Sequence, residues 1–455
     1  MVETDGARAR YVALSHRWGP QESFILTTSS MKTMTQNLPW HTIPRTYRDA
    51  IEVTQQLGIK YIWIDTLCIV QDDPEDWHRQ SVRMASVYGN SYLTISAAHS
   101  TASDTGIFTP SHLSQQFPQH SVPEHPGIYI REQPHWRHTD FGSNYSAFYT
   151  SRSLMKRGWV LQERLLSPRV VYYDAEEMKW ECKSMTDCQC GGMVVISNFK
   201  RDYHGSVDRG ETPLSHSWMR VTERYSCLDL TFEKDRLVAL AGIATAAGKS
   251  GSGGKYLAGV WEKNLAHQLC WSITRVHRKP ETYIAPSWSW MSIHGPISYQ
   301  NRMDFGLWCT RIDVNITQAE CDTGEHGAGG MGPVVGGFLK LDGRGVRMDA
   351  KLAEPGSETT PPAYELHHSS GADLGYLIQM DYTMTPAQAM DVKAVFILFW
   401  GNIEPRLNTF LVLREVPDRE RTFERLGIFW YDSSEDEEFF QVLGWCQPEK
   451  DIIMI

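Results

Sequence analysis

Two residues that can carry chemistry follow a short apolar run, Tyr61–Ile64: Asp65 comes directly after it, and Cys68 lies three residues further on. The β-branched and aromatic residues of that run predict a strand covered on both faces. In an open α/β sheet, ligands bind outside the carboxyl ends of the strands, where this carboxylate and thiol would lie. A second interpretation fits equally well: Asp65 orders its loop through hydrogen bonds, and Cys68 is a buried packing residue.

Polar residues also follow two other predicted strands, Tyr11–Ser15 and Tyr92–Ser96. The groups concerned are His16, Arg17, Trp18, Gly19 and His99. Because parallel strands deliver their carboxyl ends to one edge of a sheet, we expect these groups to lie near Asp65. The sequence therefore predicts one pocket that holds a histidine, a carboxylate and a thiol.

The elements that must position these residues alternate between strand and helix. Ile43–Leu57 has apolar residues at helical spacing, with Pro44 in the first turn and Gly58 just past the end. Asp73 and Pro74 predict the cap and the first residue of a second helix. Strand, helix and strand joined by short turns indicate parallel strands in an α/β fold.

A third helix is expected over Leu154–Leu166, where Trp159 and Glu163 lie four residues apart and share one face. Glu163 can be a catalytic carboxylate at the same sheet edge. It can also be a structural residue that pairs with Arg157 or Arg164. The sequence leaves both interpretations open.

Three cysteines, Cys182, Cys188 and Cys190, cluster after the next predicted strand. A structural zinc site needs four ligands, which are usually two close pairs, and no fourth ligand is apparent nearby in the sequence. We therefore expect free thiols and no metal site.

The composition limits the class of protein. The formal net charge of −10 argues against a nucleic-acid partner, which would need a basic surface. The longest apolar run, Ala394–Trp400, is too short to cross a bilayer, and residues 1–10 lack an apolar signal region. Nine cysteines in a chain of 455 residues do not resemble a secreted disulfide framework. A cytoplasmic protein with no membrane partner is expected.

The pattern predicts three regions along the chain. Residues 1–200 form the α/β domain, with an irregular insertion at 100–150. Residues 201–300 form a helical and aromatic connecting region, with helices over 231–247 and 256–271. Residues 301–455 contain short alternating strands and turns, which predict a β-rich region packed on the first domain.

Three blocks of this sequence resemble the fungal HET (heterokaryon incompatibility) domain. They are YVALSHRWG at Tyr11–Gly19, the block at Tyr61–Trp77 continued by Tyr88–Ala98, and the block at Arg157–Tyr173 followed by Trp180–Cys182. Their order and content both match, over roughly residues 11–182. The resemblance implies a fold similar to TIR domains, which have a parallel, flavodoxin-like sheet.

The resemblance also implies a chemistry, because many TIR domains cleave NAD with a glutamate in a Trp-x-x-x-Glu setting. Trp159 and Glu163 have that spacing. Arg17 would then hold a phosphate and Trp18 would stack on a base. The residues expected to bind the nucleotide are Ser15, Arg17, Trp18, Gly19 and Trp159. The catalytic residues expected are His16, Asp65, Cys68 and Glu163.

Three functions follow from these observations. The first is a HET-domain protein that cleaves or binds NAD in non-self recognition and cell death, with NAD as a substrate and no required cofactor. The second is an acid–base isomerase or epimerase of a small metabolite, because two groups on opposite sides of a C–H bond can exchange a proton. The third is a non-catalytic interaction module. The partner is a small-molecule or nucleotide ligand, and homo-oligomerisation is left open.

Overall fold

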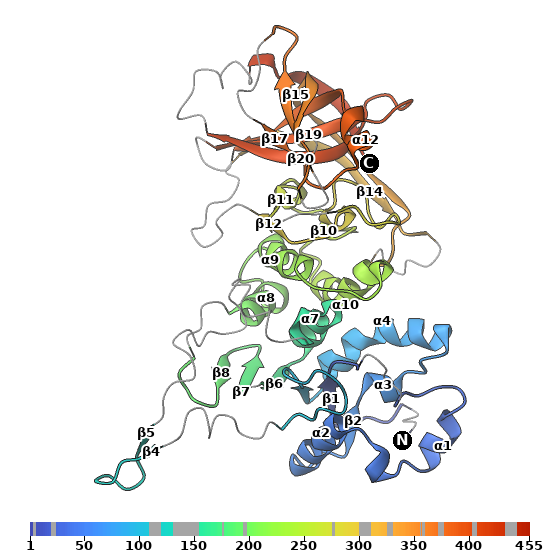
Figure 1. Ribbon diagram of the computed structural model, residues 1–455, viewed down its shortest axis with the longest axis vertical. Coiled ribbons are helices and arrows are strands. Elements are labelled where there is room, and N and C mark those ends of the chain that lie inside the picture. The colour runs from blue at the N-terminus through green and yellow to red at the C-terminus, as the bar shows by residue number, and fades with distance from the viewer. Residues whose placement is uncertain are drawn as a thin grey trace. The chain divides into compact units, whose positions relative to one another are not determined.

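The structure is a computed structural model of the chain. It describes residues 1–2, 6–19, 24–108, 120–130, 154–174, 177–193, 198–274, 278–299, 311–324, 331–354, 356, 360–371, 377–402, 407–432 and 444–455. The chain divides into two compact units (Figure 1). The first comprises Met1–Thr212 with Leu228–Leu230, and the second Pro213–Cys227 with Thr231–Ile455. Most of the predicted insertion at 100–150 lies outside the described residues.

The first unit is built around a six-stranded sheet with the order β2-β1-β3-β6-β7-β8. Its strands are β1 (Tyr11–Ser15), β2 (Tyr61–Trp63), β3 (Leu93–Ser96), β6 (Arg169–Tyr173), β7 (Met178–Cys182) and β8 (Thr186–Cys188). The first four pair in parallel, and β7 and β8 add to the edge as antiparallel strands. The predicted α/β class, with parallel strands in the first domain, is confirmed.

Helices cover both faces of this sheet. Val12 and Leu14 point to the face that packs against Tyr47 and Ala50 of α2 (Arg45–Gln56). Ala13 points to the opposite face, where it packs against Met84 and Tyr88 of α4 (Pro74–Asn90). The helix α7 (Gly158–Leu166) contacts α4 and contributes Val160 to the apolar cluster with Val170 and Tyr172 of β6. Alternate residues of β1 therefore face different helices, as the pleat of a strand requires.

The predicted helix start at Asp73 is confirmed, since its side chain accepts hydrogen bonds from the backbone N–H groups of Glu75 and Asp76. The second strand ends earlier than predicted, at Trp63, and Asp65 begins the short helix α3 (Asp65–Cys68). The other elements of this unit are α1 (Met31–Gln36), η1 (Trp40–Thr42), β4 (His120–Ser121), β5 (Tyr129–Ile130), η2 (Leu154–Lys156) and α8 (Phe199–Asp208).

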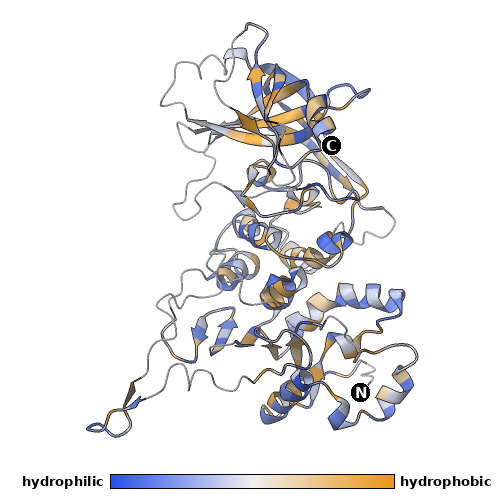
Figure 2. Ribbon diagram, in the orientation of Figure 1, coloured by the Kyte–Doolittle hydropathy of each residue, from blue (hydrophilic) through white to orange (hydrophobic). Residues whose placement is uncertain are grey.

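The second unit contains a large, mostly antiparallel sheet, which confirms the β-rich C-terminal region. Figure 2 shows hydrophobic residues along several of its strands. The strands of this sheet are β13 (Arg311–Ile312), β14 (Asn315–Asp322), β15 (Gly336–Glu354), β16 (Ala363–His367), β17 (Ile378–Gln379), β18 (Ala394–Asn402), β19 (Leu407–Glu415), β20 (Thr422–Asp432) and β21 (Gln447–Met454). Because β15 pairs with both β18 and β21, the strands β15, β18, β19, β20 and β21 close into a ring.

Several shorter elements complete this unit. They are α9 (Leu214–Ser226), η3 (Glu233–Asp235), α10 (Arg236–Gly248), β9 (Tyr256–Leu257), β10 (Val260–Trp261), α11 (Leu265–Gln268), β11 (Trp271–Ile273), η4 (Trp290–Ser292), β12 (Ile297–Tyr299) and α12 (Pro386–Asp391). The predicted helix over 231–247 corresponds to η3 and α10.

The predicted helix over 256–271 is wrong. A tight hairpin joins β9 and β10, with Val260 paired to Leu257. Its two turn residues, Ala258 and Gly259, have φ values of 46° and 103°. Two successive residues with positive φ form the kind of turn that matches strand twist and interrupts a helix. Only the short α11 remains helical in this segment.

No helix in the described part of the chain is long and apolar enough to cross a membrane. The predicted boundaries near residues 200 and 300, and the packing of the β-rich region on the first domain, stay predictions.

Candidate functional site

The carboxyl ends of β1 and β3 lie side by side in the first unit, with Ser15 directly opposite Ser96. Neighbouring side chains of paired parallel strands point to the same face. That face also carries Thr94, whose hydroxyl bonds Ser167 just past the end of α7, and the Ser167 hydroxyl donates to the carbonyl of Glu163. The last turns of α7 therefore lie over this edge of the sheet.

Glu163 is the most perturbed carboxylate at this edge. It is buried, and desolvation raises its pKa to about 7. The hydroxyls of Ser15 and Tyr88 and the charge of Arg157 act in the opposite direction, whereas the charge of Asp65 raises the pKa further. Near neutral pH, Glu163 is thus present in both its ionised and its protonated form.

Several buried polar atoms at the ends of β1 and β3 and on α7 lack a hydrogen-bond partner among the described residues. They are Oε2 of Glu163, Oγ of Ser15, Oγ of Ser96 and both side-chain polar atoms of Gln162. The Ser15 hydroxyl is near enough to influence Glu163, but neither atom completes a hydrogen bond with good geometry. Leaving buried polar groups unsatisfied is unfavourable, so such a cluster indicates a place for water or a polar ligand.

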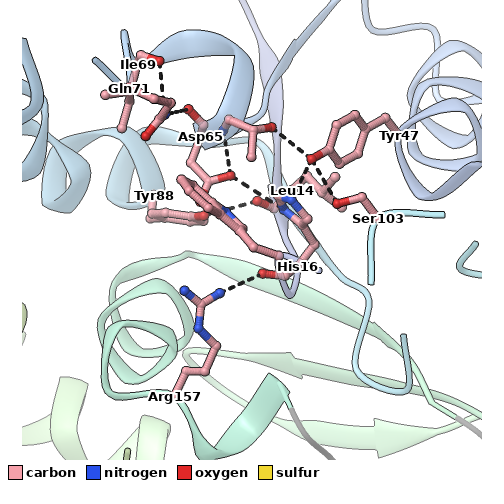
Figure 3. A network of polar contacts seen from close by, with 11 residues as sticks. Leu14, His16, Tyr47, Asp65, Ile69, Gln71, Tyr88, Ser103 and Arg157 are labelled. Atoms are coloured by element: carbon pink, nitrogen blue, oxygen red, sulfur yellow. Dashed lines mark hydrogen bonds and ion pairs between the residues drawn. The ribbon is translucent and has the colours of Figure 1, made fainter. Parts of the chain in front are cut away.

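His16 lies on the other face of the sheet, where α2 packs. Its Nε2 atom is 3.0 Å from the Tyr47 hydroxyl, which also contacts Ser103 and accepts a hydrogen bond from Thr66 (Figure 3). Its Nδ1 atom is 3.6 Å from Oδ1 of Asp65. The ring is almost completely buried, so its position is fixed from both sides.

The Asp65 carboxylate accepts hydrogen bonds from two segments of the chain. Trp18 donates a 2.9 Å hydrogen bond from Nε1 to Oδ2 of Asp65, and the backbone N–H of Thr66 donates to Oδ1. The Asp65 side chain keeps 18% of its surface exposed. A carboxylate bonded in this way orders the loop after β1 against the start of α3, and it retains one side open to solvent.

Tyr88 and Arg157 connect α4 and α7 to the end of β1 (Figure 3). The Tyr88 hydroxyl donates to the carbonyl of Leu14 at 3.1 Å. Arg157 donates from Nη1 to the carbonyl of His16 at 3.2 Å. These two bonds fix the backbone just before and just after Ser15, so they position the strand end that faces Glu163.

The structural partners suggested for Glu163 are engaged elsewhere. Arg164 forms a two-pronged, buried ion pair with Glu181, with nitrogen–oxygen distances of 2.6 and 2.8 Å. Arg157 lowers the pKa of Glu163 through its charge, but it bonds the carbonyl of His16. Within the described ranges, no ion pair involves Glu163.

The remaining predicted residues, Cys68, Arg17 and Gly19, differ in how exposed they are. Cys68 ends α3 and presents surface to solvent, yet the atoms packed around its thiol raise its pKa to about 11, with a further contribution from Asp65. The thiol is therefore protonated at neutral pH, in which form it is a poor nucleophile. Arg17 is exposed, and Gly19 approaches Ala102 so closely that a Cβ would lie 3.3 Å from the Ala102 Cβ.

Trp159 is part of the packing between helices. Its ring meets Trp77 of α4 edge-on, with centroids 6.4 Å apart, and it packs against the cluster of Ala13, Met84 and Tyr88. Of the predicted residues, the structure thus gathers Ser15, His16, Trp18, Asp65 and Glu163 at one sheet edge. The histidine and the glutamate occupy opposite faces of that edge.

Tyr47, Tyr88 and Ser96 were missed by the sequence analysis. Tyr47 and Tyr88 lie on the apolar faces of α2 and α4, where aromatic residues are usually core. Ser96 is the last residue of a strand that was predicted correctly, so its place at the carboxyl end was the one available signal.

The comparison with protein families identifies the same region. Residues 11–163 match the model of the family described as heterokaryon incompatibility protein (HET). No curated protein matches the chain, and no solved structure matches it. The matched range ends on Glu163 and includes the three parallel strands β1, β2 and β3. The match supports the resemblance of residues 11–163 to the HET family.

Proposed function

We propose that the HET domain cleaves NAD between nicotinamide and ribose, with Glu163 as the catalytic carboxylate. One observation carries the proposal: Glu163 is buried, its Oε2 has no hydrogen-bond partner within the described residues, and its pKa is raised to about 7. Its Oε2 atom is therefore available to a ligand, because no described residue completes a hydrogen bond to it.

The chemistry requires a negative charge beside the sugar. When the bond between ribose C1′ and the nicotinamide nitrogen breaks, its electron pair passes to the cationic ring, which leaves as neutral nicotinamide. The sugar then carries oxocarbenium character, which an ionised carboxylate stabilises. A water oxygen bonds to C1′ and releases its proton to solvent. The positive charge of the bound substrate would favour the ionised form of Glu163.

The exposure of Arg17 and Trp18 suggests how each would bind the nucleotide. Arg17 is exposed directly after β1, where its guanidinium is accessible to a phosphate. Trp18 is half-buried with its N–H bonded to Asp65, which leaves the ring face for stacking on a base. The packing of Trp159 supports a positioning role, because it anchors α7 against α4.

We further propose a flavodoxin-like, TIR-like core for this domain. The parallel strand order β2-β1-β3-β6, with helices on both faces, supports it. The proposed setting is non-self recognition and cell death in the cytoplasm, as the HET match suggests.

A second candidate is an acid–base isomerase or epimerase. The same pKa of about 7 favours it, because a group that titrates near the working pH both takes up and returns a proton efficiently. Glu163 would act from one side of the substrate. This function breaks a C–H bond and forms it again, and it releases no nicotinamide.

Incubation of the full chain with NAD, followed by chromatography for nicotinamide, tests the first proposal. The expected result is nicotinamide release in proportion to protein and time. A fully folded protein that releases none, with or without added small metabolites, contradicts it. Solvent deuterium incorporated into a metabolite without nicotinamide release would instead support the isomerase.

A further inference from the structure

The hairpin of β7 and β8 brings together three side chains that the proposed NAD chemistry does not use. Lys179 pairs with Cys188 in this hairpin, so the same register places Glu177 opposite Cys190, two residues further along. One ligand atom from each of Glu177, Cys188 and Cys190 lies within 4.8 Å of the others. Glu177 and Cys188 are buried, and Cys190 is half-buried.

The distances within this cluster are close to those of groups around a shared ion. The sulfur atoms of Cys188 and Cys190 are 3.2 Å apart, and Sγ of Cys190 is 3.7 Å from Oε1 of Glu177. Two thiolates at opposite corners of a zinc tetrahedron lie about 3.8 Å apart, given zinc–sulfur bonds of about 2.3 Å. Small side-chain rotations would bring both sulfurs into that geometry.

Backbone contacts also hold the ligand atoms in place. The N–H of Gly192 donates to Sγ of Cys190 at 3.3 Å, and the N–H of Cys190 donates to Oε2 of Glu177 at 2.9 Å. An N–H group directed at sulfur stabilises the thiolate. The second bond orients the carboxylate and leaves Oε1 directed at the thiol.

We propose that Glu177, Cys188 and Cys190 bind one Zn²⁺ ion, with the fourth position open to water or a small ligand. Two sulfur donors and one oxygen donor suit zinc, whereas magnesium and calcium prefer oxygen alone. Three protein ligands and an open position are the pattern of a reactive or exchangeable zinc site. The sequence predicted no metal site because no fourth ligand was apparent near the three cysteines. Glu177 supplies the third ligand, in place of Cys182.

Charge supports the same assignment. Two thiolates and a carboxylate in one cluster repel one another, and a divalent cation offsets that repulsion. Thiol ligands lose their protons when they bind a metal ion, so metal binding would release protons.

Cobalt titration of the reduced, metal-free full chain tests this proposal. We expect one Co²⁺ per chain with a thiolate-to-cobalt charge-transfer band, and displacement of Co²⁺ by Zn²⁺. Cys188→Ser and Cys190→Ser should abolish the band, and Glu177→Gln should weaken binding by about tenfold or more. Cys182→Ser is the matched control, because Cys182 is outside the cluster, and it should bind as the unaltered chain does.

A second readout uses the unaltered chain, so it does not depend on how the variants fold. Bound Zn²⁺ should slow alkylation of two cysteines, which peptide mapping should identify as Cys188 and Cys190. The proposal is overturned if reduced protein gives no charge-transfer band and no protection. Loss of the band in Cys182→Ser, or its persistence in Cys188→Ser, would also overturn it.

Discussion

The indole N–H of Trp18 donates a 2.9 Å hydrogen bond to the carboxylate of Asp65. This bond connects the loop after β1 to the first residue of α3, so two segments 47 residues apart hold each other in place. His16 approaches the other carboxylate oxygen at 3.6 Å. Asp65 therefore links the carboxyl ends of β1 and β2.

Replacing Trp18 with phenylalanine should lower the free energy of unfolding by about 1–2 kcal/mol. The change removes a donor to a charged acceptor and keeps an aromatic ring. Chemical denaturation measures the effect, and Trp40→Phe is the control because Trp40 is exposed. Equal stability of the two variants would show that the bond contributes nothing.

Replacing Glu163 with glutamine should stabilise the protein at high pH and leave it little changed at low pH. The pKa of Glu163 is raised from 4.5 to about 7 in the folded state. Below pH 4.5 both states hold the proton, so there is no penalty. Between pH 4.5 and 7 the unfolded chain ionises first, and folding stability falls by up to about 3 kcal/mol.

Denaturation of the unaltered chain and of Glu163→Gln, across this pH range, measures the difference. Glu52→Gln is the matched control, because Glu52 is an exposed residue of α2. The prediction fails if the stability difference between the chain and Glu163→Gln is constant with pH, or if the glutamine variant is the less stable one above pH 7.

Glu181 should show the opposite pH dependence. Burial opposes its ionisation, but the guanidinium of Arg164 lowers its pKa to about 2. Its contribution is complete above pH 4.5 and is lost as the pH falls through about 2. Glu181→Gln should cost about 3–5 kcal/mol at neutral pH, because it leaves a buried arginine without its counter-charge. The acid-denaturation curve of Glu181→Gln, monitored by circular dichroism, should be less steep than that of the unaltered chain. An unchanged midpoint pH in the variant would contradict this role of Glu181.

Gly259 should tolerate no side chain in the second unit. Its φ is 103°, and a Cβ there would lie 3.0 Å from Met291 and 3.1 Å from Trp290. Gly259→Ala should therefore destabilise the protein by about 1–3 kcal/mol. Gly336→Ala is the control, because a Cβ at Gly336 meets nothing within 4 Å. Similar thermal midpoints for the two variants would contradict the strain.

The sequence predicted the elements whose signals are local. The strands β1 and β3 and the helices α2, α4 and α7 lie where apolar periodicity and capping residues indicated. The helix expected over 256–271 failed because Tyr256, Val260 and Trp261 fit helical spacing and a hairpin equally well. The turn depends on a positive φ at Ala258, which alanine rarely adopts, so the residue type gives no signal for it.

The candidate site was predictable in outline for a similar reason. Strand ends can be placed from sequence, so Asp65, His16 and Ser15 were found. The assignment of residues to the two faces of the sheet depends on how α2 and α7 pack, which separates His16 from Glu163. The metal ligand Glu177 that we propose was not apparent either, because only the register of β7 and β8 places it opposite Cys190.

The rate of nicotinamide release from NAD by Glu163→Gln, beside the unaltered chain and Glu52→Gln, tests the central claim most directly. Glutamine keeps the size of the side chain and removes its charge. We predict that turnover falls by about a hundredfold or more in Glu163→Gln while Glu52→Gln keeps full activity. Turnover by a folded Glu163→Gln protein at the rate of the unaltered chain would contradict the assignment of Glu163 as the catalytic carboxylate.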